Sequence, residues 1–361
     1  MKIVTVIGAR PQFIKATVVS RQLRKKKHFK EIIVHTGQHY DDNMSEIFFK
    51  ELGIPKPSYN LGIGSDYQGA QAGRMLEAVE NVLLKEKPGC VLVYGDTNST
   101  LAGALAAAKL HIPIAHVEAG LRSFNRDMPE EINRVVADAV SDILFAPTKT
   151  AVNNLLREGI DRTRIKLVGD VMYDVALYYG QIAEHRNSIL KSLGLTKKDY
   201  ILSTIHRAEN TDNQVRLRAI IGGLNEVAKN IRVILPLHPR TRSYLRKFKI
   251  STGNINIIDP VGYLDMIILE KDTRLIATDS GGVQKEAFFY KVPCVTLRTE
   301  TEWVELVELG WNYVAPPHNA REIAKAIINN LNHKGKHSLP YGRGNSAELI
   351  VRYLEEKIGR N

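Results

Sequence analysis

A strand–turn–helix pattern at residues 275–286 carries groups that could bind a phosphate beside a sugar. An apolar, β-favouring run is followed by Asp279, by Ser-Gly-Gly at 280–282, and then by a helical pattern. Such a turn presents backbone N–H groups at the positive end of the helix dipole, and glycine lets a phosphate approach them closely. Glu286 lies about one turn into the helix, where its carboxylate could accept hydrogen bonds from ribose hydroxyls. A glycine-containing turn that binds nothing explains this segment equally well.

Further polar residues fall where expected strands end. In parallel α/β sheets, ligands bind beyond the carboxyl ends of the strands. The strand ends of both halves of the chain carry charged, amide or imidazole side chains, namely Arg10, Lys15, Gln38, His39, Asp96, Glu118, His206 and His238. So many such residues, drawn from both halves, favour one ligand cleft between two domains over coincidence.

Each of these residues also has a structural explanation. Asp96 could cap the helix that follows it, and Arg10 and Lys15 could be solvated surface charges. The two histidines could be ordinary loop or core residues. Glu118 is harder to explain in this way, because a carboxylate at the end of an apolar strand is costly to bury unless it is paired or used. An exposed loop carboxylate is the alternative for Glu118.

The segment Pro-Glu-Glu-Ile-Asn-Arg at 129–134 has the features of a helix start. Proline stands at the first position, and the helix dipole favours the acidic residues that follow. Glu130 and Arg134 are four residues apart and therefore share a helix face. A surface ion pair explains them about as well as a catalytic acid beside a cation.

Strand and helix patterns alternate along the whole chain. Short apolar runs suited to buried strands occur in the first half at 3–7, 31–36, 91–94, 113–117 and 143–146, and in the second half at 200–204, 232–237, 255–258, 275–277 and 295–297. Helical patterns between them predict an α/β fold with parallel sheets covered on both faces. We expect a first domain at 1–170, a second at 171–345, and a helix in 346–361 that packs back on the first domain.

Composition narrows the class of protein further. The net charge is +11 and the isoelectric point about 9.4, which favours an anionic partner. The basic residues are dispersed, which favours a small anionic substrate over nucleic acid. No apolar run approaches the ~18 residues of a membrane span, and no signal peptide is recognisable, so we expect a cytoplasmic protein without a membrane partner. Cys90 and Cys294 are expected to be buried free thiols. Neither a metal-ligand cluster nor a dinucleotide or Walker motif is present, so no cofactor is expected.

Several of these segments together resemble a known family. The motifs GARPQFIK (8–15), TGQH (36–39), GDT (95–97), HVEAGLR (116–122), PEEINR (129–134) and TDSGGVQKE (278–286) occur in this order over nearly the whole chain. They resemble the non-hydrolysing UDP-N-acetylglucosamine 2-epimerases. The resemblance implies two Rossmann-like domains in a glycosyltransferase-B arrangement, with the active site in the cleft. It also implies a homodimer that serves polysaccharide biosynthesis.

The resemblance further implies the reaction and the residues that carry it. UDP-N-acetylglucosamine and UDP-N-acetylmannosamine would be interconverted by loss of the C2 proton together with UDP, and by return of both with inversion at C2. The implied catalytic residues are Asp96, Glu118, Glu130 and His206. The implied substrate-binding residues are Arg10, Lys15, Arg134, His238, Ser280, Gly281, Gly282 and Glu286. Which residue takes the C2 proton is left open.

Departures from the common family pattern keep alternatives open. Gln12 replaces the usual glutamate, 207–210 reads Arg-Ala-Glu-Asn where many members have Arg-Arg-Glu, and Thr-Glu-Trp at 301–303 replaces Thr-Glu-Arg. These variants resemble the branch that acts on UDP-2,3-diacetamido-2,3-dideoxyglucuronate, whose C6 carboxylate would need a cation such as Arg207, Arg122 or Arg126. The segment 40–43 also departs from members activated by a second substrate molecule. A glycosyltransferase of the same fold is the other alternative.

Overall fold

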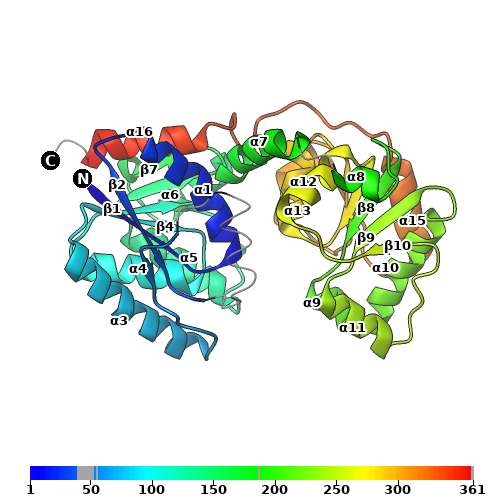
Figure 1. The fold of residues 1–361 in the computed structure, drawn as a ribbon, viewed down its shortest axis with the longest axis horizontal. Coiled ribbons are helices and arrows are strands. Elements are labelled where there is room, and N and C mark those ends of the chain that lie inside the picture. The colour runs from blue at the N-terminus through cyan, green and yellow to red at the C-terminus, as the bar shows by residue number, and fades with distance from the viewer. Residues whose placement is uncertain (39–52, 54–55, 186–187, 359–361) are drawn as a thin grey trace. The chain divides into compact units, whose positions relative to one another are not determined.

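The computed structural model describes residues 1–38, 53, 56–185 and 188–358, and the chain divides into two compact units (Figure 1). Unit 1 comprises Met1–Val175 and Leu339–Asn361, and unit 2 comprises Ala176–Ser338. Residues 171–175 and 339–345 thus lie in unit 1. Each unit contains its own parallel sheet, so the prediction of a two-domain, Rossmann-like α/β fold is confirmed.

Unit 1 is built on a parallel sheet with the strand order β3-β2-β1-β4-β5-β6-β7. The central strands are continuous apolar runs because helices cover both faces of the sheet. The strands are β1 (Lys2–Ile7), β2 (Lys30–His35), β3 (Tyr59–Asn60), β4 (Cys90–Tyr94), β5 (Ile114–Val117), β6 (Ile143–Ala146) and β7 (Ile165–Leu167).

The helices of unit 1 begin where local sequence favours them. Pro11 and Pro129 stand in the first turns of α1 and α5, while Thr97 and Thr148 cap α4 and α6 with their hydroxyls. Helix α16 packs against α1. The helices are α1 (Arg10–Arg24), α3 (Gln68–Glu86), α4 (Asn98–Lys109), α5 (Pro129–Val140), α6 (Lys149–Arg157), the 3-10 turn η1 (Arg162–Arg164), α7 (Val171–Glu184), which continues into unit 2, and α16 (Ser346–Ile358).

Unit 2 repeats this architecture with the strand order β10-β9-β8-β11-β12-β13. Its core lies between the sheet and helices α10 and α15. The strands are β8 (Tyr200–Thr204), β9 (Arg232–Pro236), β10 (Asn256–Ile258), β11 (Leu275–Thr278), β12 (Cys294–Thr296) and β13 (Asn312–Val314). The helices are α8 (Ser188–Ser192), α9 (Ala208–Thr211), α10 (Gln214–Val227), α11 (Pro239–Lys247), α12 (Tyr263–Asp272), α13 (Gly281–Phe289), α14 (Val304–Glu308) and α15 (Ala320–Asn330).

The strand orders place a topological switch point in each unit. The chain order reverses between β1 and β4 in unit 1, and between β8 and β11 in unit 2. Ligands of open parallel sheets bind beside such reversals, at the carboxyl ends of the strands. Predicted site residues follow β1, β4 and the neighbouring β5 in unit 1, and β8, β11 and the neighbouring β9 in unit 2.

Two sequence expectations concern the rest of the molecule. Cys90 and Cys294 are buried free thiols as expected, and burial raises the pKa of each to about 12. Among the helices that the structure describes, none has the length and hydropathy needed to cross a bilayer.

Candidate functional site

A buried ion pair lies beside the switch point of unit 1. Lys15 Nζ is 2.6 Å from Glu118 Oε1, and the two side chains are only 12% and 10% exposed. The pair lies over the loop after β4, because a Cβ atom built on Gly95 would be 3.6 Å from Lys15 Nζ. Such a pair is poorly screened by water, so the cation stabilises the carboxylate charge strongly. Helix α1 and strand β5 thus bring together two predicted site residues.

The backbone of Glu118 is strained. Its φ is +73°, in the left-handed region that residues with a side chain rarely adopt. The neighbouring turn residues Gly95 and Gly120 have φ of +64° and +81°, which glycine tolerates. Strain of about 1–3 kcal/mol persists only where surrounding contacts enforce it, and it concentrates at functional sites. Glu118 is therefore held in place by more than its own side chain.

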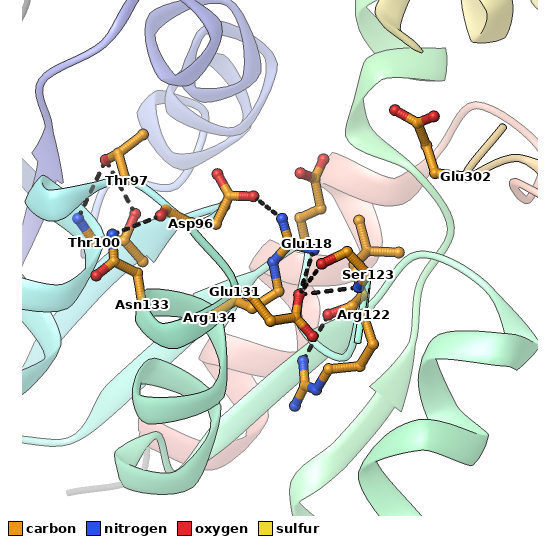
Figure 2. A network of polar contacts seen from close by, with 12 residues as sticks. Asp96, Thr97, Thr100, Glu118, Arg122, Ser123, Glu131, Asn133, Arg134 and Glu302 are labelled. Atoms are coloured by element: carbon orange, nitrogen blue, oxygen red, sulfur yellow. Dashed lines mark hydrogen bonds and ion pairs between the residues drawn. The ribbon is translucent and has the colours of Figure 1, made fainter. Parts of the chain in front are cut away.

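A second charged cluster connects the end of β4 to α5 (Figure 2). Arg134 forms ion pairs with Asp96 and, at 3.1 Å, with Glu131. Asn133 Nδ2 donates to the Asp96 carbonyl at 3.0 Å. Asp96 does not cap the next helix, because Thr97 occupies that position and accepts from Thr100 N. The capping explanation for Asp96 is thus wrong, and its carboxylate faces a cation.

Glu131 is a buried member of this cluster that was not among the site residues predicted from the sequence. It accepts hydrogen bonds from Ser123 N and Oγ, both at 2.9 Å, and from Phe124 N at 3.0 Å. Burial acts to raise the pKa of Glu131, but these bonds and the Arg134 charge outweigh it, so the pKa lies below its usual range. Arg134 thus pairs with Asp96 and Glu131, whereas Glu130 is exposed on the first turn of α5. The spacing of three between Glu131 and Arg134 was the available signal.

The remaining unit 1 candidates have mixed placements. Arg10 is exposed at the start of α1. Gln38 Oε1 accepts from Ser99 Oγ at 2.7 Å and from Ser99 N at 3.2 Å, which ties the end of β2 to α4. His39 lies outside the described residues.

Gln12 is buried and donates to the Tyr94 carbonyl at 2.7 Å, a bond that the usual glutamate could not donate when ionised.

Arg122 is already committed to other partners. Its side chain is 1% exposed and contacts both Asp138 and Glu158. A guanidinium held by two carboxylates is not available as the cation for a substrate carboxylate. Arg207 and Arg126 remain candidates for that role.

The turn after β11 in unit 2 is organised by a buried carboxylate. Asp279 accepts from His206 N at 3.1 Å, from Arg207 N at 3.1 Å and from Asn210 Nδ2 at 3.1 Å. It thereby fastens the loop after β8 to the end of β11. The His206 ring is 45% exposed beside Asp279, and its centroid is 6.1 Å from that of His238. The two predicted histidines are therefore neighbours within unit 2.

His238 is the N-cap residue of helix α11. Its Nδ1 accepts from Arg240 N at 3.2 Å, which places the ring proton on Nε2 in the neutral form. Partial burial, then the charges of His206 and Arg240, lower the pKa of His238. The neutral ring can donate one hydrogen bond from Nε2.

The predicted phosphate turn has the expected local geometry. Ser280 caps α13, its Oγ accepting from Val283 N at 3.5 Å. Gly281 lies close to Glu302, because a Cβ there would be 2.6 Å from Glu302 Oε1 and that side chain would have to shift. Trp303 Nε1 donates to the Gly281 carbonyl at 2.9 Å. Trp303, which departs from the family pattern, thus packs on this turn, while Gly282 is exposed and Glu286 is half-buried one turn further on.

Helix α12 places a second carboxyl group near Glu286. Glu270 is 1% exposed. Burial, and then the charge of Glu286, raise the pKa of Glu270 well above 4.5, so folding favours the neutral form of this carboxyl group. Above pH 4.5 the unfolded chain releases this proton while the folded chain keeps it. The free energy of unfolding therefore falls as the pH rises above that value.

Replacing Glu270 by glutamine is expected to increase stability above about pH 5. The amide preserves the shape but carries no group to ionise in the unfolded state. Urea unfolding of the wild type and the variant between about pH 5 and about pH 8 should show a gap that widens with pH. Glu226→Gln is the control, because that side chain is 53% exposed. A gap independent of pH would contradict the assignment.

Two Rossmann-like units that gather carboxylates, cations and a glycine-containing strand–helix turn at their strand ends are typical of enzymes that bind nucleotide-linked substrates. The model of the UDP-N-acetylglucosamine 2-epimerase family matches residues 21–355. This chain belongs to that family, and it is an isomerase.

Individual relatives cover almost the full chain. A UDP-N-acetylglucosamine 2-epimerase homolog of Methanococcus maripaludis is 55% identical over 98% of this chain and 99% of its own. The UDP-2,3-diacetamido-2,3-dideoxy-D-glucuronate 2-epimerase of Pseudomonas aeruginosa is 54% identical over 98% of this chain and 99% of its own. The structure of Methanocaldococcus jannaschii UDP-GlcNAc 2-epimerase in complex with UDP-GlcNAc and UDP superimposes with a TM-score of 0.87 over 99% of this chain and 100% of that one. The two sequences are 49% identical.

Proposed function

We propose that this protein interconverts UDP-N-acetylglucosamine (UDP-GlcNAc) and UDP-N-acetylmannosamine. The buried Lys15–Glu118 pair carries the proposal, because it offers a water-poor carboxylate at a strand end, where α/β enzymes bind their substrates. The 49% identity to the Methanocaldococcus jannaschii enzyme, whose structure contains UDP-GlcNAc and UDP, supports this substrate.

In the proposed reaction, Glu118 accepts the C2 proton. The electrons of the C2–H bond form a C1–C2 double bond, and those of the C1–O bond leave with UDP. The reverse steps return UDP to C1 and a proton to the opposite face of C2. The C2–H group is a weak acid, so its removal must be concerted with departure of UDP. Asp96, Glu130 and His206 are the candidates for the acid on the other face.

The binding roles divide between the two units. In unit 2, we assign the phosphates to the turn Ser280, Gly281 and Gly282, because Ser280 caps α13 and Gly282 is exposed. Glu286 is assigned to ribose hydroxyls. His238, whose neutral ring can donate one hydrogen bond from Nε2, is assigned to the bound substrate. In unit 1, Arg10 and Lys15 contribute positive charge that stabilises departing UDP. Arg134 acts through Asp96, with which it forms an ion pair.

Incubation with UDP-GlcNAc in heavy water tests this function. Epimerisation is expected to yield both UDP-sugars with deuterium at C2, as measured by NMR and mass spectrometry. Retention of protium at C2, or transfer of the sugar to an added acceptor, would exclude the proposed reaction and favour a glycosyltransferase.

The 3-acetamido uronate analogue is the second candidate substrate. The 54% identity to the Pseudomonas aeruginosa enzyme supports it, as does the sequence around His206. Arg207 is the cation we assign to its C6 carboxylate, although Arg207 Nη2 also lies 3.2 Å from Glu302. In the same heavy-water assay, we compare kcat/KM for the two substrates and take the one with the higher value as the physiological substrate.

Substitution Arg207→Gln separates the two substrates further. It is expected to raise KM for the uronate by about tenfold, because the variant loses one charge-assisted hydrogen bond. KM for UDP-GlcNAc should change little, since that sugar has no carboxylate. Equal effects on both substrates would remove Arg207 from this role.

The family resemblance supports three further proposals. We propose a homodimer, a cytoplasmic location, and a UDP-sugar product used in polysaccharide biosynthesis. Light scattering of the purified protein tests the first of these, and a monomeric mass would contradict it.

A further inference from the structure

A buried carboxylate of α5 lies behind the proposed proton acceptor. Asp138 is 1% exposed and accepts from three groups of the β5 strand and the loop after it. His116 Nδ1 is 2.7 Å from its Oδ1, Gly120 N is 3.0 Å from its Oδ2, and Arg122 Nη1 is 2.8 Å from Oδ2. Burial acts to raise the pKa of Asp138, but His116 and Arg122 outweigh it and lower the pKa, so the carboxylate is charged.

These contacts hold the residues that lie on either side of Glu118 in the sequence. His116 lies two residues before Glu118, and Gly120 lies two residues after it. A single carboxylate therefore fixes both flanks of a residue whose φ is +73°. Without such fixed flanks, the backbone would relax toward negative φ and turn the side chain away from Lys15.

The same network reaches the loop after β4. His116 Nε2 is 2.7 Å from the carbonyl oxygen of Gly95, the residue before Asp96. Both ring nitrogens of His116 thus face acceptors, one on α5 and one on the β4 loop. Asp138 is in this way connected to the backbone beside two of the proposed acid/base residues.

We propose that Asp138, acting through His116 and Gly120, is a positioning residue that holds Glu118 in its strained, reactive orientation. The inference rests on the proposed function, since it assigns the proton-accepting role to Glu118. An error of about 1 Å in the placement of a reacting group can cost roughly a hundredfold in rate. The network should therefore act on kcat and leave nucleotide binding by unit 2 unchanged.

The test compares Asp138→Asn with Asp174→Asn. Asp174 is also buried and accepts from the backbone N–H groups of Ser346 and Ala347, but it joins α7 to α16 rather than flanking β5. Both substitutions replace a buried carboxyl group that accepts backbone hydrogen bonds by an amide. Asp138→Asn is expected to lower kcat about ten- to a hundredfold, with KM and the Kd for UDP within about threefold. Asp174→Asn is expected to lower stability without lowering kcat.

Several outcomes would overturn the inference. If Asp138→Asn loses stability but keeps wild-type kcat, Asp138 is only structural. If both variants lose kcat equally, the effect is not specific to the β5 loop. Should Asp138→Asn fail to fold, His116→Gln decides, because a folded variant with wild-type kcat contradicts the proposal. Wild-type activity is measured first on both UDP-sugars, so that failure of the proposed function is recognised separately.

A crystal structure of Asp138→Asn tests the same point without an activity assay. Glu118 is expected to leave positive φ, and the Lys15–Glu118 contact of 2.6 Å should lengthen. An unchanged loop in that variant would overturn the inference.

Discussion

Replacement of Glu118 by glutamine is expected to lower kcat for C2 epimerisation by about a thousandfold, the effect of losing a general base. The amide has the same shape but cannot accept the C2 proton. It also removes the negative charge that Lys15 Nζ faces at 2.6 Å. Incorporation of deuterium at C2 should fall in parallel with net epimerisation, because both depend on the same proton transfer.

Two comparisons make this result specific. Asp142→Asn is the control, because Asp142 accepts from Ile114 N at 2.8 Å at the opposite end of β5. That variant should keep wild-type kcat. The Kd of Glu118→Gln for UDP, measured by calorimetry, should stay within about twofold, because we assign the phosphate turn and the ribose contact to unit 2. Deuterium exchange at near wild-type rate in Glu118→Gln would remove this residue from the catalytic set.

Replacement of Gly120 by alanine is expected to destabilise unit 1 by about 2–5 kcal/mol. Gly120 has φ of +81°, and a Cβ there would be 2.4 Å from the carbonyl oxygen of Ala151. The obstacle is backbone of α6, which cannot move aside as a flexible side chain can. Gly120 N also donates to Asp138, so any displacement should disturb the Glu118 loop and lower kcat as well.

Gly159→Ala separates the two causes of this loss. Gly159 has φ of +82°, but a Cβ there would meet nothing within 4 Å. It therefore reports the backbone penalty alone, about 1 kcal/mol. Urea unfolding followed by circular dichroism should show a much larger loss for Gly120→Ala than for Gly159→Ala. Equal losses would mean that the loop yields to the new methyl group without cost.

The sequence predicted the layout of the sheets because the relevant signals are local. Apolar runs of three to six residues alternate with helical patterns, and such alternation has few solutions other than covered parallel sheets. Helix α3 ends at Glu86 because Pro88-Gly89 marks the end of a helix in the sequence. Local patterns likewise identified Ser280 as part of a strand–helix turn.

The pairs that charged side chains form were harder to predict from the sequence, because they depend on residues that are distant in the sequence. The helix period allowed Arg134 to pair with Glu130 or Glu131, and only the packing of α5 beside the 123–124 loop selects Glu131. Asp279 belongs to a recognised motif, but its partners in the loop after β8 lie about seventy residues away. No local pattern reports such contacts.

By itself, the sequence determined the two α/β units, the family, and the strand ends at which charged residues gather. These follow from short-range periodicity and from motifs that keep their order. Only the tertiary structure decided which charges meet: Lys15 with Glu118, Arg134 with Asp96, and Asp138 with both flanks of Glu118. The positive φ of Glu118 belongs to the same category, because a strained backbone is maintained by the surrounding contacts and not by the residue that bears it.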